Sequence, residues 1–231
     1  YNYNGQLWPL PQTGQMWLEH YLLEHPEEDG FFCVSTSYRN EPNPVEGRHD
    51  KIFPMFEFEL KGGIDELRKV EMELLDYLGF NKEGETMTYP RDDYDNIAKK
   101  YDVEELDHIH EEYIERDFGK AFFLENFPRR TSPFWNMKHT EDKEHANKID
   151  VIIHGIETIG SAERSNDPSQ MKEMFNTISD GGYANILFAQ FGKERVEKEL
   201  EDFLKKDFFQ RSGGGIGMTR MIRAMKLSNL I

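Results

Sequence analysis

Two acidic residues lie seven positions apart in a segment that reads as a tight hairpin, residues 149–164 (IDVIIHGIETIGSAER). If the chain turns at His154-Gly155, Asp150 becomes the diagonal neighbour of Glu157 on one face. Diagonal positions are roughly 7–8 Å apart at the backbone, so the two carboxylates can share one hard cation. Mg²⁺ typically takes one or two carboxylates and adds substrate phosphates. The alternative is two solvated acids on an exposed hairpin.

The same hairpin carries an arginine that strict alternation would turn away from the acids. The register that this turn sets pairs Ile152 with Glu157. Arg164 then falls on the face opposite Glu157. We expect Gly160 to mark a β-bulge that redirects Arg164.

A second polar set lies on an earlier pair of expected strands. Arg39 and Glu41 are two positions apart and share a face, and the returning strand places Phe53 on its polar face. A guanidinium, a carboxylate and an aromatic ring can hold an anion, an amino group and a flat ring, which are the parts of ATP. The alternative is an ion pair beside a partly covered phenylalanine.

The third candidate is the glycine-rich run 213–217 (GGGIG), which we expect to be a turn that opens a last helix. Glycine lets the backbone approach a ligand closely, and helix N-termini favour anions. Arg220 follows one helical turn later. The run has neither the lysine of a Walker A loop nor the spacing of a dinucleotide fingerprint.

Hydrophobic periodicity predicts the elements that carry these residues. The predicted strands cover 31–41, 51–60, 120–124, 134–137 and the hairpin 149–163, and the predicted helices cover 64–78, 92–101, 107–117, 168–179 and 193–206. Because strands come in hairpins with helices between them, we expect an α+β fold with a mainly antiparallel β-sheet flanked by helices. The length of 231 residues suits a single domain.

Composition narrows the function further. The single cysteine, Cys33, excludes an intramolecular disulfide and multi-cysteine zinc sites, which predicts a reducing, cytoplasmic setting. No apolar run approaches the roughly 20 residues of a membrane helix. The formal net charge is −16, and basic residues cluster no further than pairs such as Arg129-Arg130. Nucleic-acid binders need a basic stripe, so a large RNA footprint is disfavoured.

Together, in this order, the segments resemble the catalytic core of class II aminoacyl-tRNA synthetases, in the aspartate/asparagine branch that includes asparagine-synthetase relatives. Residues 10–15 (LPQTGQ) resemble the amino-acid-binding loop, and residues 38–41 (YRNE) resemble the F-R-x-E of motif 2. Residues 48–53 resemble the motif 2 loop R-H-x-x-E-F, and residues 213–220 resemble motif 3, G-x-G-x-G-x-x-R. The family has three site residues separated by seven positions each, and Asp150, Glu157 and Arg164 match this spacing.

This resemblance implies a role for each matched residue. Arg39 and Arg220 would be catalytic, through the α-phosphate and the outer phosphates. The implied ATP-binding residues are Arg39, Glu41, Arg48, His49, Phe53, Glu157 and Arg220. The implied amino-acid-binding residues are Gln12, Thr13, Gln15 and Arg164, and the implied Mg²⁺ ligands are Asp150 and Glu157. The chemistry is attack of a carboxylate on the α-phosphorus of ATP, which requires positioning and charge neutralisation.

The sequence also departs from the resemblance. Leu18 stands where the aspartate branch usually has lysine, and Glu163 stands where glutamine is usual, which adds an acid near the side-chain pocket. We recognise neither motif 1 nor an anticodon-binding domain in residues 1–231, and expect this range to be one catalytic, amino-acid-activating domain.

The resemblance leaves three functions open. The leading expectation is an ammonia-dependent, asparagine-synthetase-like ligase that forms an aminoacyl adenylate and passes it to ammonia or another amine. The alternatives are the core of an asparaginyl- or aspartyl-tRNA synthetase and an inactive paralogue that binds a nucleotide or a protein. We expect ATP as substrate, Mg²⁺ as cofactor and a homodimer. tRNA is disfavoured by charge, and neither DNA nor a membrane is expected as a partner.

Overall fold

The computed structural model describes residues 2–7, 10–39, 50–81 and 89–231, and a seven-stranded sheet organises them. The strands lie in the order β3 (Gly30–Tyr38), β4 (Ile52–Lys61), β9 (Arg211–Gly217), β8 (Ile156–Glu163), β7 (His145–Ile153), β6 (Ala121–Pro128) and β5 (Arg91–Asp93). Among the strands of the described residues, only the β5–β6 pair is parallel. A separate hairpin joins β1 (Asn2–Tyr3) and β2 (Gln6–Leu7). The expected α+β fold with a mainly antiparallel sheet is confirmed.

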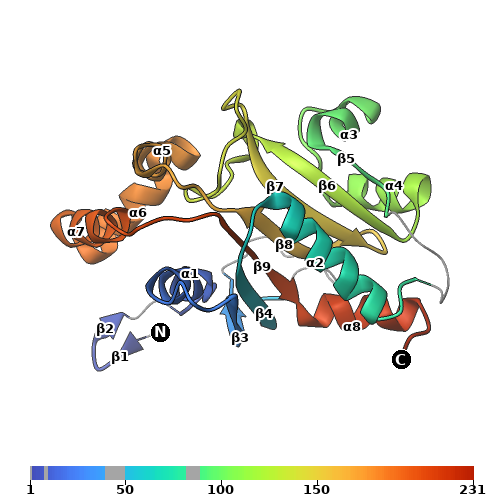
Figure 1. Cartoon of the computed structure of the whole chain (residues 1–231), viewed down its shortest axis with the longest axis horizontal. Coiled ribbons are helices and arrows are strands. Elements are labelled where there is room, and N and C mark those ends of the chain that lie inside the picture. The colour runs from blue at the N-terminus through green and yellow to red at the C-terminus, as the bar shows by residue number, and fades with distance from the viewer. Residues whose placement is uncertain (1, 8–9, 40–49, 82–88) are drawn as a thin grey trace.

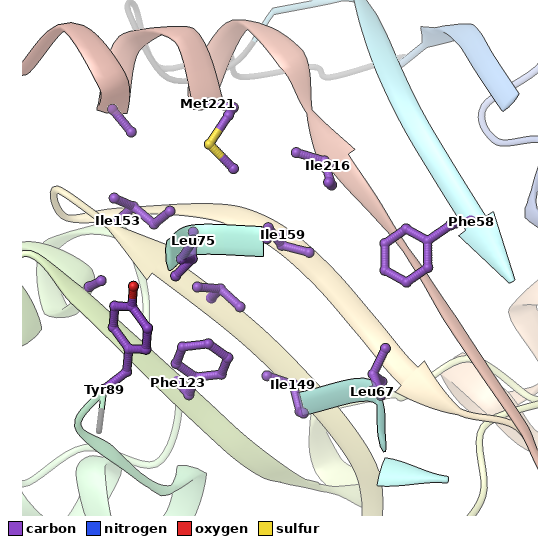
Figure 2. Packing of buried hydrophobic residues seen from close by; sticks show 13 residues of the cluster. Phe58, Leu67, Leu75, Tyr89, Phe123, Ile149, Ile153, Ile159, Ile216 and Met221 are labelled. Carbon is purple, nitrogen blue, oxygen red and sulfur yellow. The ribbon is translucent and has the colours of Figure 1, made fainter. Parts of the chain in front are cut away.

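One face of the sheet is apolar and is covered by α2 (Ile64–Tyr77) and α8 (Met218–Leu227). Figure 2 shows Leu67 and Leu75 of α2 and Met221 of α8 packed against isoleucines of the central strands. These helices form because their apolar residues recur at helical spacing. Burial of this face supplies the main hydrophobic core.

The opposite face is polar in its middle and covered at its two ends. Helix α1 (Gln15–Glu24) contacts β3, β4 and β9, and α3 (Tyr94–Lys100) and α4 (His108–Phe118) pack at the β5–β6–β7 end. The middle strands β7, β8 and β9 present Asp150, Gly160 and Gly215 to this face, in mutual register. The helices on this face therefore lie on either side of the strands that carry the residues that could do chemistry.

Between β8 and β9 the chain forms a helical cluster of α5 (Pro168–Thr177), η2 (Ile178–Gly181), α6 (Gly182–Phe191) and α7 (Lys193–Leu204). In Figure 1 it lies at the end of the molecule opposite α3 and α4. Its core surrounds Trp135, which follows the short 3₁₀ turn η1 (Arg129–Thr131). Trp135 and its neighbour Phe134 explain one wrong prediction: residues 134–137 form no strand, because both rings pack into this helical core.

The other predicted elements are present, with ends shifted by a few residues. Two helices were not predicted, α1 and α6. Within the described parts of the chain, none of the helices combines the length and apolarity needed to span a bilayer.

Candidate active site

A solvent-open cleft of about 490 Å³ lies over the middle of the polar face. Its lining residues come from strands that are distant in sequence and from the start of α8: Arg39, Asp50, Phe53, Met55, Glu157, Thr158, Gly160, Gly215, Gly217, Thr219 and Arg220. Four predicted site residues, Arg39, Phe53, Glu157 and Arg220, therefore share one cavity.

Arg39 and Phe53 face each other at the end of the β3–β4 hairpin. The Arg39 guanidinium carbon lies 5.4 Å from the centroid of the Phe53 ring. The Arg39 backbone N–H donates to the carbonyl of Lys51 at 2.9 Å, which continues the strand pairing beyond Tyr38. Hairpin register thus holds a cation and an aromatic ring side by side, as binding of a phosphorylated purine requires.

Arg220 enters the cleft from the first turn of α8, which begins directly after β9. Its Nη1 donates to the backbone carbonyl of Glu157 at 2.6 Å and lies 3.9 Å from Oε2 of the same residue. The guanidinium is half-buried, with 26% of its side chain exposed. Arg220 therefore contributes a guanidinium to the same cleft that Arg39 lines.

Asp150 and Glu157 converge on Gly160. Ile152 pairs with Glu157, as predicted, whereas further from the turn Asp150 pairs with Gly160. A Cβ built on Gly160 would lie 2.8 Å from Oε1 of Glu157 and 3.5 Å from Oδ1 of Asp150. A side chain at this position would fill the space between the two carboxylates.

The β-bulge lies at a different residue from the one predicted. The register shifts between Val151 and Ile152, which makes Thr158 the extra residue, not Gly160. One extra residue reverses the alternation, so Arg164 lies on the same face as Glu157. The β-bulge therefore redirects Arg164 as predicted, but its extra residue is Thr158 and not a glycine.

The acid pair fits a divalent cation. Oδ1 of Asp150 is buried and has no hydrogen-bond partner among the described residues, and Glu157 lines the cleft. Burial raises the pKa of Asp150 to about 7; Lys148 opposes this rise, while the charges of Glu157 and Glu111 add to it. In the part of the chain that the structure describes, no group of three or more His, Cys, Asp or Glu residues could hold a metal. An ion here would need phosphate or water oxygens as well.

The glycine-rich run is a strand, which corrects the prediction of a turn. Residues 211–217 form β9 and pair with β4 and β8 on either side. Glycine is needed because neighbouring side chains lie across this strand: a Cβ on Gly213 would overlap the Glu59 carboxylate, and one on Gly215 would lie 2.5 Å from Cε of Met55. The helix that follows begins at Met218, as expected.

Beyond Gly215 the polar face continues to Glu57, a residue that the sequence interpretation missed. Oε1 of Glu57 accepts hydrogen bonds from the hydroxyl of Thr13 and the backbone N–H of Gly14, and Oε2 accepts from the hydroxyl of Ser35 at 2.5 Å. The alternation of β4, with Glu57 among acids facing away from the core, was the available signal.

The other predicted amino-acid-binding residues lie around this carboxylate. Nε2 of Gln15 lies 3.9 Å from the position of a Gly215 Cβ, at the edge of the cleft. Gln12 has an exposed side chain and accepts a hydrogen bond from the Ser37 hydroxyl through its backbone carbonyl. The structure thus brings Thr13 and Gln15 to the site, and the backbone alone of Gln12.

Arg164 lies further along the same strip, where it forms a buried ion pair with Glu59. Nε of Arg164 is 3.1 Å from Oε1 of Glu59, and Nη2 contacts the same oxygen. The side chains are 4% and 0% exposed. Burial raises the pKa of Glu59 to about 7, and the guanidinium opposes this rise. Arg164 is therefore already paired with an acid in the protein.

The acid that contacts Arg164 is Glu59 and not Glu163, the acid expected near the substrate side chain. Glu163 projects from the other face of β8, where Lys138 Nζ contacts Oε1 at 2.8 Å and Asn147 donates to Oε2 at 2.7 Å. Three predicted ATP-binding residues, Glu41, Arg48 and His49, lie outside the described residues.

A mainly antiparallel sheet of seven strands, flanked by helices, places this chain in the class II synthetase fold. The family model described as tRNA synthetases class II (D, K and N) matches residues 1–231, and the chain belongs to this family.

Curated relatives carry tRNA-ligase names. The chain is similar to the aspartate–tRNA(Asp) ligase of Thermoplasma acidophilum, with 23% identity over 166 residues, which covers 68% of this chain and 37% of the relative. It is also similar to the lysine–tRNA ligase of Aquifex aeolicus, with 28% identity over 120 residues, 51% of this chain and 19% of the relative. The chain thus spans well under half the length of either relative.

Solved structures support the same fold. Asparaginyl-tRNA synthetase from Pyrococcus horikoshii, complexed with asparaginyl-adenylate, superposes with a TM-score of 0.73 at 19% identity and covers 93% of this chain and 52% of its own. Aspartyl-tRNA synthetase from Entamoeba histolytica superposes with a TM-score of 0.70 at 17% identity, and the match covers 93% of this chain and 48% of that one. The chain is therefore related to adenylate-forming aminoacyl-tRNA ligases.

Proposed function

We propose that this domain uses ATP and Mg²⁺ to activate an amino acid of the aspartate/asparagine class as its aminoacyl adenylate. The observation that carries the proposal is the line of groups along the glycine strand β9. Phe53, Arg39 and Arg220 lie at the Gly217 end, Glu57 and Gln15 lie beside Gly215, and the Arg164–Glu59 pair lies against Gly213. Gly213 and Gly217 are four strand steps apart, roughly 13 Å, so these groups form one continuous row along β9.

In this proposal each part of the line has a chemical task. Phe53 stacks on the adenine, while Arg39 and Arg220 neutralise charge as the substrate carboxylate attacks the α-phosphorus and pyrophosphate leaves. Glu57 binds the substrate ammonium, because its side chain and that of Gln15 both lie within 4 Å of the Gly215 Cβ position. Glu157 and Asp150 would hold Mg²⁺, which would supply further neutralisation of the phosphates. Catalysis then comes from preorganised charge and from orientation.

The buried end of the line favours a neutral side chain. Arg164 offers guanidinium donors, and ionised Glu59 offers carboxylate acceptors, so the pair carries no net charge while Glu59 is ionised. A side-chain amide has both a donor and an acceptor, whereas a carboxylate only accepts. We therefore propose asparagine ahead of aspartate. This choice supports the core of an asparaginyl-tRNA synthetase-like enzyme ahead of an ammonia-dependent ligase, whose substrate is aspartate.

Amino-acid-dependent exchange of pyrophosphate into ATP tests the proposal. Each of the twenty amino acids is assayed with the purified chain, and exchange should be fastest with asparagine. Exchange with aspartate as the best substrate would reject the choice of side chain but keep the activation chemistry. If ATP binds and no amino acid supports exchange, the reading as an inactive nucleotide-binding paralogue replaces this one.

The acceptor of the adenylate has a second candidate. The names of the curated relatives favour tRNA. The net charge of −16, without any basic cluster beyond pairs, favours a small amine such as ammonia. Product analysis separates them: aspartate, ATP and ammonium should yield asparagine without tRNA only if the amide-forming reading is correct. Transfer of label to tRNA and not to ammonia would establish the synthetase reading.

A further inference from the structure

Lys148 is a charged residue of the site that neither the motifs nor the proposed chemistry uses. It lies two positions before Asp150 on β7, on the same face of the strand, and its Nζ contacts Oδ2 of Asp150. The side chains of the two residues are only 20% and 11% exposed, respectively. A half-buried ion pair therefore stands directly beside the proposed metal site.

The ammonium is held from a second side by an aromatic ring. Nζ of Lys148 lies 3.5 Å from the centroid of Phe127, which belongs to the neighbouring strand β6. A cation within about 6 Å of a ring face gains from the ring's electrostatic field, and gains more where water is excluded. Phe127 is itself buried. The flexible lysine side chain is thus confined to one position against Asp150.

The two acids of the proposed metal site differ in their surroundings as a result. Glu157 lines the cleft and its side chain is 42% exposed, whereas Asp150 is outside the cleft lining. Asp150 presents Oδ1 toward Gly160 and Glu157, and its Oδ2 is occupied by Lys148. One oxygen of Asp150 is available to a shared ion, and the other already has a cation.

We propose that Lys148 is a positioning residue, whose ammonium is a built-in cation on Asp150 that restricts the acid pair to a single divalent ion. The inference rests on the proposed function. An ammonium that is tethered to the strand has already lost water on folding, whereas Mg²⁺ must give up its water on binding and does so reluctantly. It also fixes the rotation of the Asp150 carboxylate, so that Oδ1 stays directed at the space beside Gly160.

Counting bound Mn²⁺ by electron paramagnetic resonance tests the proposal without any turnover. The count is made in saturating α,β-methylene-ATP, for the wild type and for Lys148→Met, Lys148→Gln and Lys148→Arg. Both neutral variants should bind one more Mn²⁺ per bound nucleotide than the wild type, because Oδ2 of Asp150 is released. Lys148→Arg should match the wild type. The double variant Lys148→Met/Asp150→Asn should lose the additional ion.

Lys138→Met is the matched control, since Lys138 also pairs with a buried acid, Glu163, but on the other face of β8. Its Mn²⁺ count should equal that of the wild type. Equal counts in the wild type and in both neutral Lys148 variants, with the analogue bound to all, would overturn this inference and leave the proposed function standing. Failure of the analogue to bind the wild type would overturn both.

Discussion

Arg220 and Glu157 are joined by a hydrogen bond of 2.6 Å, from Nη1 of the arginine to the backbone carbonyl of the glutamate. This bond connects the first turn of α8 to the bulged part of β8. The Glu157 carboxylate remains in the cleft, and its Oε2 lies 3.9 Å from the same guanidinium. A movement of α8 would therefore displace the cation and the acid of the site together, which makes the start of α8 part of the site's geometry.

Removal of either cleft arginine should slow activation. Arg39→Ala and Arg220→Ala should each reduce kcat in pyrophosphate exchange by about 10²-fold or more, as loss of a charge-stabilising group does in other enzymes. Arg195→Ala on the exposed face of α7 is the control and should leave the rate unchanged. Wild-type rates in Arg39→Ala or Arg220→Ala, measured at saturating ATP, would exclude a catalytic role for that arginine.

The Arg164–Glu59 pair should determine which substrate side chain, aspartate or asparagine, the enzyme prefers. Glu59→Gln leaves Arg164 with an unbalanced positive charge, so the ratio of kcat/KM for aspartate over asparagine should rise. Breaking a buried pair also costs about 3–5 kcal/mol in the free energy of unfolding.

Glu19→Gln separates the two effects, because Glu19 forms a comparable buried pair with Arg211, at 2.6 Å from Nη2 to Oε1. It should lower stability by a similar amount and leave the substrate ratio unchanged. An unchanged ratio in Glu59→Gln as well would mean that the pair is structural only.

The glycines of β9 should be required for folding. Gly213→Ala places a Cβ against the Glu59 carboxylate and the Phe58 backbone carbonyl, and overpacking of this kind typically costs about 1–3 kcal/mol. Gly217→Ala is the matched control, because its Cβ would meet only the flexible Arg220 side chain, at 3.4 Å. Denaturant unfolding compares the two, and equal stability would contradict the close packing on β9.

Glu71 should make the protein less stable as the pH rises. It lies on the buried face of α2, and burial raises its pKa to about 8 from an ordinary value of 4.5. The folded state therefore keeps a proton that the unfolded state releases, so stability falls as the pH rises from about 4.5 to about 8. The full loss is about 5 kcal/mol, from about 1.4 kcal/mol for each pKa unit.

Glu71→Gln should abolish this loss: the variant should match the wild type near pH 4.5 and exceed it at pH 8.5 in the free energy of unfolding. Glu73→Gln, at an exposed position of the same helix, should follow the wild-type pH profile. Parallel profiles for Glu71→Gln and the wild type would show that Glu71 ionises at its ordinary pKa in the folded state.

Local patterns in the sequence determined much of the sheet and part of the site. The alternation of residues 51–60 and the turn at His154-Gly155 specify their hairpins, because strand period and turn geometry depend on neighbouring residues only. The helix that became α2 was predicted from its apolar spacing for the same reason. Arg39 and Phe53 are brought together by one hairpin, and so are Asp150 and Glu157.

Contacts between distant segments decided the rest. Helix α1 was missed because it buries Glu19 and exposes Trp17, and Glu19 is stabilised there by Arg211, 192 residues away, and by Asn136, 117 residues away. The glycine run has the composition of a turn, yet it is a central strand because Glu59 and Met55 lie where its side chains would be. The pairing of Arg164 with Glu59 likewise depends on β4 and β8 flanking β9, since charge compensation in a buried site is a property of the assembled sheet and not of any one segment.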